Sequence, residues 1–320
     1  MFPFRNILFP TDLSANSRAA LKYAAGFAQN GNGRVLLFNV QNSKVPVNLM
    51  SMSDERLHEQ NNQSLLAIKV ETQNLLNDPY FANVEVNVAI VDGEPPAEIA
   101  RATIDHEIDL VTVVARGRKG FSRAFGVSIS EEIIAESNCA VLAIRPPQRD
   151  FVERHNGETQ FRLRRILLAT NFRPSSAAAT SLATQLANHT GAELHAVYVI
   201  GDYFQQISAM FPEGGLAALT KLRGYVEERM VHLARSDGSR AITHIVEGRP
   251  YEEIVRIAAR TDIDLIVIGT AVHNSLFGGT PVLGSEIERV IRNAPCPVLC
   301  VPAARVLTPL PAFVTQTVPT

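Results

Sequence analysis

The sequence has little net charge, few cysteines and no long apolar run, and each shortage excludes a class of protein. Its 320 residues hold 30 Lys and Arg against 32 Asp and Glu, a formal net charge of −2, so bulk charge does not favour binding of duplex DNA or anionic lipid. No apolar stretch approaches the roughly 18–20 residues that span a bilayer, and the first ten residues lack the features of a signal peptide. Three cysteines are an odd number and argue against a disulfide framework. We expect a cytoplasmic protein that binds neither nucleic acid nor membrane.

Most motifs of α/β enzymes are also missing. The segment nearest to a phosphate-binding P-loop, 279–285, has Ser285 where the motif needs lysine, and no Gly-x-Gly-x-x-Gly follows a strand pattern. Residues 126–130 resemble a nucleophile elbow, but Ser130 stands in place of the last glycine. Cys296 and Cys300 have no second pair of ligands, so buried packing thiols are expected rather than a zinc site. We therefore expect no enzyme, or at most a slow ATPase for which no positioned base is evident.

What the sequence does contain is a long repeat. Residues 5–12 (RNILFPTD) recur as residues 164–171 (RRILLATN), which places position 12 at position 171, an offset of 159 residues. Four further blocks recur in the same order at offsets of 159, 155, 155 and 157: 35–40 with 194–199, 93–99 with 248–254, 109–114 with 264–269, and 139–142 with 296–299. The period far exceeds the roughly 20–50 residues of stacked repeats. The chain is therefore a duplicated domain, with loops that differ in length between the copies.

The repeat sets the domain boundaries. We assign the first repeat to residues 1–146, a linker to residues 147–162 and the second repeat to residues 163–302. The linker is polar and proline-containing. Residues 303–320 contain three prolines and no helix or strand period, which predicts an irregular tail.

Within each repeat, short apolar runs alternate with amphipathic stretches. In the first repeat we expect strands at 6–9, 35–40, 84–90, 109–114 and 140–144, and helices at 17–29, 53–76, 95–106 and 128–137. Strands that are apolar on both faces and alternate with helices indicate a parallel sheet covered on both sides. The fold class is α/β, with two tandem, doubly wound, Rossmann-like domains of five parallel strands each. Ligands of such sheets bind beyond the carboxyl ends of the strands.

The ordered blocks resemble the universal stress protein family. They comprise Ile-Leu-x-Pro-Thr-Asp, Gly-x-Pro, Asp-Leu-Ile-Val-x-Gly-Thr, a glycine-rich loop, Gly-Ser and Cys-Pro-Val-Leu, and they cover nearly the whole chain twice. The resemblance implies the fold of adenine-nucleotide α-hydrolases and, in one class of members, ATP bound through Gly-x-x-Gly, nine residues and Gly-[Ser/Thr]. Glycines let the backbone approach the ligand, and the last pair opens a helix whose N–H groups hold phosphate. The resemblance also implies that the Asp after the first strand contacts the adenine side of the nucleotide pocket.

Each repeat keeps a different part of this pattern. The first repeat has Asp12 and a loop of the family's length, but Val114 and Val127 stand at two of its three glycine positions. Its loop is basic, with Arg116, Arg118, Lys119 and Arg123. The second repeat has Asn171 for the Asp and Val272 for the middle glycine, and its loop is two residues longer, with Gly278 and Gly279 as alternative flexible positions. The candidate nucleotide-binding residues are Pro10, Thr11, Asp12, Val40, Gly117 and Ser128 in the first repeat, and Thr170, Asn171, Val199, Gly269, Thr270, Gly284 and Ser285 in the second.

These features leave two main functions open. One is a regulator that binds ATP or AMP, with or without Mg²⁺, as a signal. The other is an interaction module with vestigial pockets, as the valines suggest. In that case Ser285 only caps a helix, and the basic loop is only a solvated surface. The resemblance also implies that last strands pair across a dimer. Residues 141–144 are then expected to pair with 298–301 in an internal pseudo-dimer, and a homodimer is the other possibility.

Overall fold

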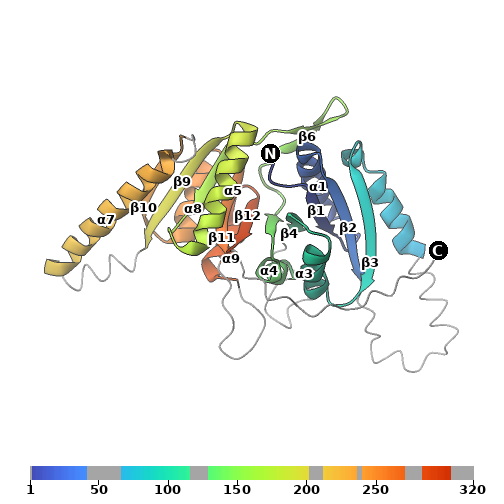
Figure 1. The fold of residues 1–320 in the computed structure, drawn as a ribbon, viewed down its shortest axis with the longest axis horizontal. Coiled ribbons are helices and arrows are strands. Elements are labelled where there is room, and N and C mark those ends of the chain that lie inside the picture. The colour runs from blue at the N-terminus through green and yellow to red at the C-terminus, as the bar shows by residue number, and fades with distance from the viewer. Residues whose placement is uncertain are drawn as a thin grey trace, which may run out of the picture.

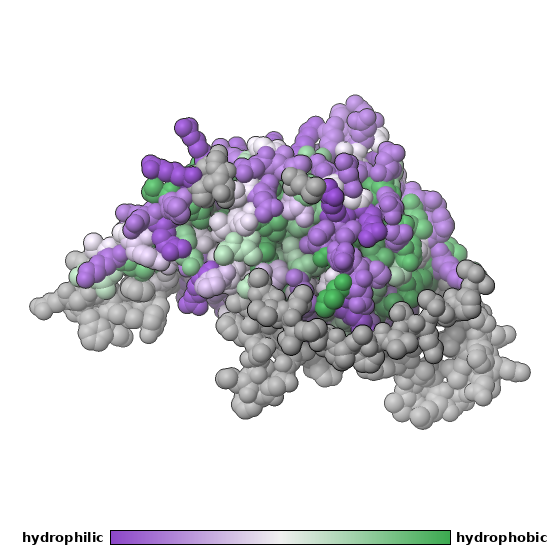
Figure 2. Space-filling view, viewed as in Figure 1, coloured by the Kyte–Doolittle hydropathy of each residue, from purple (hydrophilic) through white to green (hydrophobic). Residues whose placement is uncertain are grey.

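A computed structural model of the chain describes residues 2–41, 66–115, 129–201, 212–235, 240–270 and 283–303. The predicted tail from residue 304 onward and the first part of the helix predicted at 53–76 lie outside the described residues, and residues 66–76 of that helix are helical. Among the described residues, no helix combines the length and the apolar composition that crossing a bilayer requires. Hydrophilic residues are spread over both halves of the face seen in Figure 2.

Both repeats have the predicted alternation of strands and helices. The first contains β1 (Asn6–Pro10), α1 (Arg18–Gly31), β2 (Arg34–Gln41), the short 3₁₀ turn η2 (Pro79–Phe81), β3 (Glu85–Asp92), α3 (Pro95–Asp105), β4 (Leu110–Val114), α4 (Ile129–Glu136) and β5 (Ala140–Ile144). The second contains β8 (Arg165–Ala169), α5 (Pro174–Thr190), β9 (Glu193–Gly201), α7 (Pro212–Arg235), β10 (Ile242–Gly248), α8 (Pro250–Arg260), β11 (Leu265–Thr270), α9 (Ser285–Asn293) and β12 (Val298–Pro302). The predicted α/β class is confirmed.

The two halves share one ten-stranded sheet. Its order is β10-β9-β8-β11-β12-β5-β4-β1-β2-β3, and the halves lie side by side along it in Figure 1. Strands within each half are parallel, whereas β12 runs antiparallel to β5 with Leu299 opposite Leu142. The predicted pairing of the two last strands is thus confirmed, and the chain forms a pseudo-dimer within itself.

Each face of the sheet is covered by helices from both repeats. The first core layer holds the buried sides of α1, α5 and α7, and the second core layer holds those of α3, α4, α8 and α9. Helix α1 follows from apolar residues at helical spacing, such as Leu21, Ala24 and Phe27, and it ends at Asn32 in the left-handed conformation (φ 47°). Both repeats place a proline in the first turn of the helix after their third strand, at Pro95 and Pro250, where the missing N–H costs little.

The segment between the repeats is a β-hairpin, which its polar composition did not predict. Strands β6 (Val152–His155) and β7 (Glu158–Phe161) pair antiparallel and project at the top of Figure 1. Asn156 and Gly157 form the two-residue turn, with φ values of 51° and 85°, and Asn-Gly is a strong hairpin signal. The apolar residues at the base, Phe151 and Phe161, pack with their ring centroids 5.3 Å apart.

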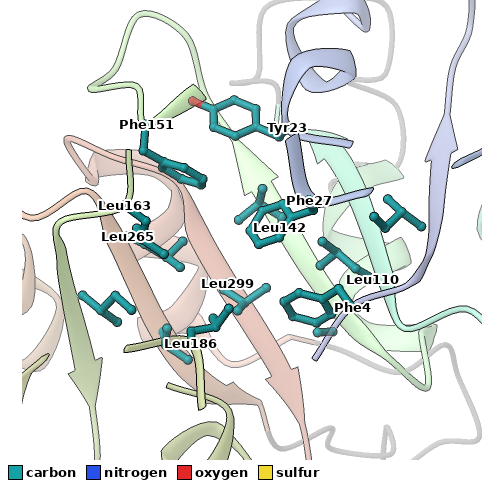
Figure 3. Close-up of a cluster of buried hydrophobic side chains, with 14 of the residues drawn as sticks. Phe4, Tyr23, Phe27, Leu110, Leu142, Phe151, Leu163, Leu186, Leu265 and Leu299 are labelled. Atoms are coloured by element: carbon teal, nitrogen blue, oxygen red, sulfur yellow. The ribbon is translucent and has the colours of Figure 1, made fainter. Parts of the chain in front are cut away.

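This hairpin is fastened to both repeats. Asp150 accepts hydrogen bonds from Lys22 Nζ, at 2.6 Å, and from the Tyr23 hydroxyl, both on α1. The preceding residue, Arg149, donates its backbone N–H to the Pro295 carbonyl at 2.7 Å and a guanidinium N–H to the Ile263 carbonyl at 2.8 Å. Figure 3 shows Phe151 and Leu163 between Tyr23 of α1 and Leu265 of β11. Adjacent residues of the linker therefore hold opposite halves of the molecule.

The three cysteines are unpaired, as expected, and Cys296 and Cys300 are buried. Burial is the main reason why the pKa of each thiol, including that of Cys139, rises to about 12. We expect all three to be inert to Ellman's reagent in the native protein near pH 8, because only about one thiol in ten thousand is then a thiolate. In guanidinium chloride all three should react. Rapid reaction of any native thiol would contradict this prediction.

Gly26 explains how closely the hairpin approaches α1. A Cβ added at Gly26 would lie 2.9 and 3.0 Å from the two Cγ atoms of Val152, and glycine in a helix otherwise costs about 1 kcal/mol relative to alanine. We expect Gly26→Ala to lower the free energy of unfolding by about 1 kcal/mol despite its better helix propensity.

A double-mutant cycle with Val152→Ala checks this contact. In chemical denaturation the double variant should be more stable than the sum of the single losses, by about 1 kcal/mol, because the second substitution removes both clashing methyl groups. Strict additivity would show that the hairpin does not require this glycine.

Candidate functional site

Five of the seven candidate residues of the second repeat lie at or near the carboxyl ends of three neighbouring strands, β8, β9 and β11: Thr170, Asn171, Val199, Gly269 and Thr270. Thr170 follows β8 and donates its backbone N–H to the Val197 carbonyl of β9 at 3.0 Å. On the other side of β8, Ala169 pairs with Ile268 of β11, just before Gly269 and Thr270. This is the point where the strand order reverses, and it is where ligands of doubly wound sheets bind.

The loop after β8 is ordered by its own polar groups. The Asn171 Oδ1 accepts hydrogen bonds from the Arg173 backbone N–H at 3.0 Å and from the Ser176 hydroxyl at 2.7 Å. Because a backbone N–H can only donate, these bonds fix the orientation of the amide. The oxygen of Asn171 is therefore used by the loop, and its Nδ2 has no hydrogen-bond partner among the described residues.

Aromatic stacking holds the next residue of this loop. Phe172 has a φ of 56°, a left-handed conformation that is uncommon for a bulky side chain. Its ring stacks on Tyr198 of β9, with centroids 5.4 Å apart, and the Arg229 guanidinium of α7 lies 4.9 Å from its centroid. Together these contacts offset the backbone strain and tie α7 to the edge of the site.

Gly269 is required by packing within the protein. A Cβ at this position would lie 2.2 Å from the Ser175 carbonyl oxygen and 3.0 Å from the Ser176 Cα, in the first turn of α5. No side chain avoids a backbone atom at that distance. The glycine therefore lets α5 begin directly against the end of β11, and its presence needs no ligand.

Gly284 is different, because nothing in the described protein requires it. Its φ of −62° and ψ of 136° suit any residue, and an added Cβ would have open space except for the Ile287 Cδ1 at 4.0 Å. It is the N-cap of α9 without a side-chain cap. The N–H groups of Ser285 and Glu286 have no acceptor among the described residues. The helix start combines room with unused donors, which are the requirements for binding an anion.

A buried hydroxyl lies on the same side of the sheet. Thr270 is 1% exposed, and its Oγ1 has no hydrogen-bond partner among the described residues. Alternation along β11 places it with Ile266 and Ile268 in the second core layer, to which Leu283, just before α9, also belongs. Val199 packs against the same layer. An unpaired buried hydroxyl costs free energy, so the described residues leave the Thr270 hydroxyl in need of a hydrogen-bond partner.

In the first repeat the equivalent loop is held by hydrogen bonds and by Leu13, which packs against the first core layer. The Asp12 Oδ1 accepts from the Ser14 backbone N–H at 3.1 Å and from its hydroxyl at 2.5 Å. Asn39 of β2 donates its Nδ2 to the Thr11 carbonyl at 2.8 Å, and the Thr11 and Ser17 hydroxyls lie 2.8 Å apart. Pro10 ends β1 and Val40 lies near the end of β2, so the described candidates gather here as well.

Val114 occupies the position equivalent to Gly269, and in its repeat the helix after the first strand begins later than in the other repeat. Helix α5 begins at Pro174, which corresponds to position 15, whereas α1 begins at Arg18. The Val114 side chain packs against the first core layer, where the first turn of α5 lies in the other repeat. Gly117, Ser128 and the basic loop lie outside the described residues.

Sequence reasoning missed the residues that hold the two loops. Ser17 and Ser176 are repeat equivalents at the 159-residue offset and bond to Thr11 and Asn171, respectively; their identity in both copies was an available signal. The stack of Phe172, Tyr198 and Arg229 has no such signal, because it joins residues from three separate elements. No group of three metal-binding side chains occurs among the described residues.

Substitution of Gly269 should destabilise the protein much more than substitution of Gly284. We expect Gly269→Ala to lower the free energy of unfolding by about 1–3 kcal/mol, because the methyl group meets backbone rather than a movable side chain. Gly284→Ser should change it by only a few tenths, because serine caps helices well. Urea denaturation of both variants tests this, and an equal loss in both would refute the distinction.

Comparisons with known proteins agree with the duplicated fold. The model of the universal stress protein family matches residues 3–145 and again residues 162–302. A universal stress protein of Methanocaldococcus jannaschii is 34% identical over 156 residues, 46% of this chain and 85% of that protein; one of Thermus aquaticus is 32% identical over 139 residues, 42% of this chain and 96% of its own. The crystal structure of a universal stress protein from Archaeoglobus fulgidus shares the fold with a TM-score of 0.63 at 22% identity, covering 94% of this chain and 97% of that one. The chain belongs to the universal stress protein family.

Proposed function

We propose that this protein is a cytoplasmic stress-response regulator that binds an adenine nucleotide, ATP or AMP, in its second repeat. The observation that carries the proposal is the start of α9, where Gly284 leaves open space beside two N–H groups that have no acceptor among the described residues. A glycine that the protein's own packing does not need is explained by the close approach of a ligand.

The surrounding groups suit the rest of a nucleotide. The α9 N-terminus supplies N–H groups and the positive end of the helix dipole for phosphate. Thr270 offers a buried hydroxyl without a partner among the described residues, and Val199 offers a partly buried apolar side chain for a base. Mg²⁺ would accompany ATP through its phosphates.

Binding without turnover fits this site best. Asn171 carries an amide, which accepts hydrogen bonds but does not take up a proton near neutral pH, and its oxygen already accepts from Arg173 and Ser176. It therefore cannot serve as a general base. A nucleotide held in this way acts as a signal: its binding stabilises one state of the protein by mass action. Gly284→Ser is also expected to abolish any slow hydrolysis that depends on this site.

An interaction module with vestigial pockets is the second candidate, and Val114 favours it for the first repeat. Its side chain packs in the first core layer where the motif has a glycine, and the Asp12 carboxylate already bonds to Ser14. We therefore propose one nucleotide per chain rather than two.

Isothermal titration with ATP and with AMP, after removal of any copurified ligand, tests the proposal. We expect one site per chain and a melting temperature that rises with nucleotide concentration. Gly284→Ser should weaken binding at least tenfold while leaving the free protein's stability nearly unchanged, because its hydroxyl competes for the same N–H groups.

Glu94→Ser is the matched control, since it places a serine at the N-cap of α3 in the other repeat and should leave the affinity unchanged. If neither nucleotide at millimolar concentration binds or shifts the melting temperature, the nucleotide proposal fails and the interaction module remains. Unchanged affinity in Gly284→Ser would place the nucleotide elsewhere.

A further inference from the structure

Two histidines and a glutamate form a hydrogen-bonded row at the amino end of the outer strands of the second repeat. The His195 Nε2 lies 2.8 Å from the Glu193 Oε1, and its Nδ1 lies 3.0 Å from the His244 Nε2. The two rings lie edge to edge and nearly coplanar, with centroids 5.3 Å apart and planes 7° apart. His195 is 4% exposed, and His244 is half-buried on the edge strand β10.

The row fixes the tautomer of both rings in the neutral state. An ionised Glu193 only accepts hydrogen bonds, so the His195 Nε2 carries the proton that it donates. The His195 Nδ1 is then an acceptor, and the His244 Nε2 must donate to it. One side-chain hydrogen bond thus reinforces the backbone pairing of β9 with β10, and it exists only while at least one of the facing nitrogens lacks a proton.

The pair can hold one added proton but not two. When His195 is protonated, its Nδ1–H donates to a His244 ring that changes tautomer, and Glu193 stabilises the positive charge. A second proton puts two N–H groups opposite each other at 3.0 Å, which breaks the bond and sets like charges side by side. Burial and the neighbouring His195 both lower the pKa of His244, in agreement with this geometry.

The charged groups around the row do not neutralise a second proton. Glu193 is shared with Arg165 of β8, whose Nε lies 3.6 Å from its Oε1, and Arg165 also lies 4.0 Å from Asp262. Asp264 is buried and accepts from the backbone N–H groups of Arg164 and Arg165. Helix α8 presents Ile257 and Ala258 to this face, and its last turn carries the exposed Arg260. On the opposite face the last turn of α7 adds His232 and Arg235, so the carboxylates named here are matched by guanidiniums and leave no surplus negative charge for a second proton.

The first repeat shows that the fold does not need this row. At the equivalent positions Leu36 replaces His195, Ala89 replaces His244 and Arg34 replaces Glu193, on strands paired in the same register. Leu36 and Ala89 pack in the second core layer without polar groups to satisfy. The second repeat thus carries a partly buried, titratable network where its twin has ordinary apolar packing.

We propose that Glu193, His195 and His244 form an acid-sensitive latch, a side-chain contact that reinforces the pairing of the outer strands of the second repeat at neutral pH and is lost when the second histidine is protonated. Loss of this contact would act on the strand that also carries part of the candidate nucleotide site. Strand β9 contains His195 and, four residues later, the candidate residue Val199. The latch does not depend on nucleotide binding.

The direction of the pH effect follows from linkage. A histidine whose pKa is lower in the folded than in the unfolded protein stabilises the fold fully above the unfolded value, about 6.5, and loses that contribution as the pH falls towards and below the folded value. Acidification from about pH 7.5 to about pH 5 should therefore destabilise this region.

Melting temperatures of the full chain across this pH range provide the test. The double variant His195→Leu/His244→Ala carries the residues of the first repeat, and its loss on acidification should be smaller than that of the unsubstituted protein by about 2–4 °C for each kcal/mol that the latch contributes. His232→Ala, which removes an exposed histidine of α7, is the matched control and should follow the unsubstituted profile. Identical profiles for the double variant and the unsubstituted protein would overturn the proposal.

Nuclear magnetic resonance of the histidine rings in the unsubstituted protein gives a second readout that needs no variant. Near neutral pH both rings should show the Nε2–H tautomer. On acidification the pair should take up its two protons in separate steps, the second clearly below about pH 6.5, the ordinary value for histidine. Uptake of both protons together near that value would also overturn the proposal, whatever the variants do.

Discussion

The antiparallel pairing of β5 with β12 is the constraint on which the rest of the molecule depends. Each repeat alone would end in an apolar edge strand, and such edges are prone to associate. Pairing them, with Leu299 opposite Leu142, merges two sheets into one and makes both core layers continuous across the repeats. The hairpin and the ion pair between Arg292 of α9 and Glu131 of α4, at 2.8 Å, reinforce the same junction.

Close packing decides which glycines carry functional information. Gly26 makes room for Val152 of the hairpin, and Gly269 makes room for the backbone of α5. Both are explained by the protein's own atoms. Gly284 borders open space at a helix start, and the packing of the described residues does not require it. Two of these three glycines are therefore required by close packing within the protein, and the third is not.

Duplication has let one fold hold two different sets of side chains. Val114 and Gly269 occupy equivalent strand ends and set different helix starts, while Leu36 and His195 occupy equivalent core positions with opposite polarity. The loop after the first strand is held by Asn39 in one copy and by stacking on Tyr198 in the other. Each repeat serves as an internal reference for what the fold requires and what its twin has added.

The sequence by itself determined the duplication and the order of strands and helices, because hydrophobic period and block order are local properties of the chain. The pairing of the last strands was expected from the family resemblance, which left a homodimer open, and the structure decided between the two. The sequence also located the candidate positions at the strand ends, since the topology of parallel sheets carries them there. The tertiary structure alone decided that Gly269 serves packing and Gly284 does not. The hairpin had a signal in the sequence, the Asn-Gly turn, but only the tertiary structure showed that it is fastened to both repeats. The tertiary structure alone brought Phe172, Tyr198 and Arg229 into one stack and His195 beside His244. These features depend on contacts between residues distant in the chain, and neither local period nor motif spacing encodes such contacts.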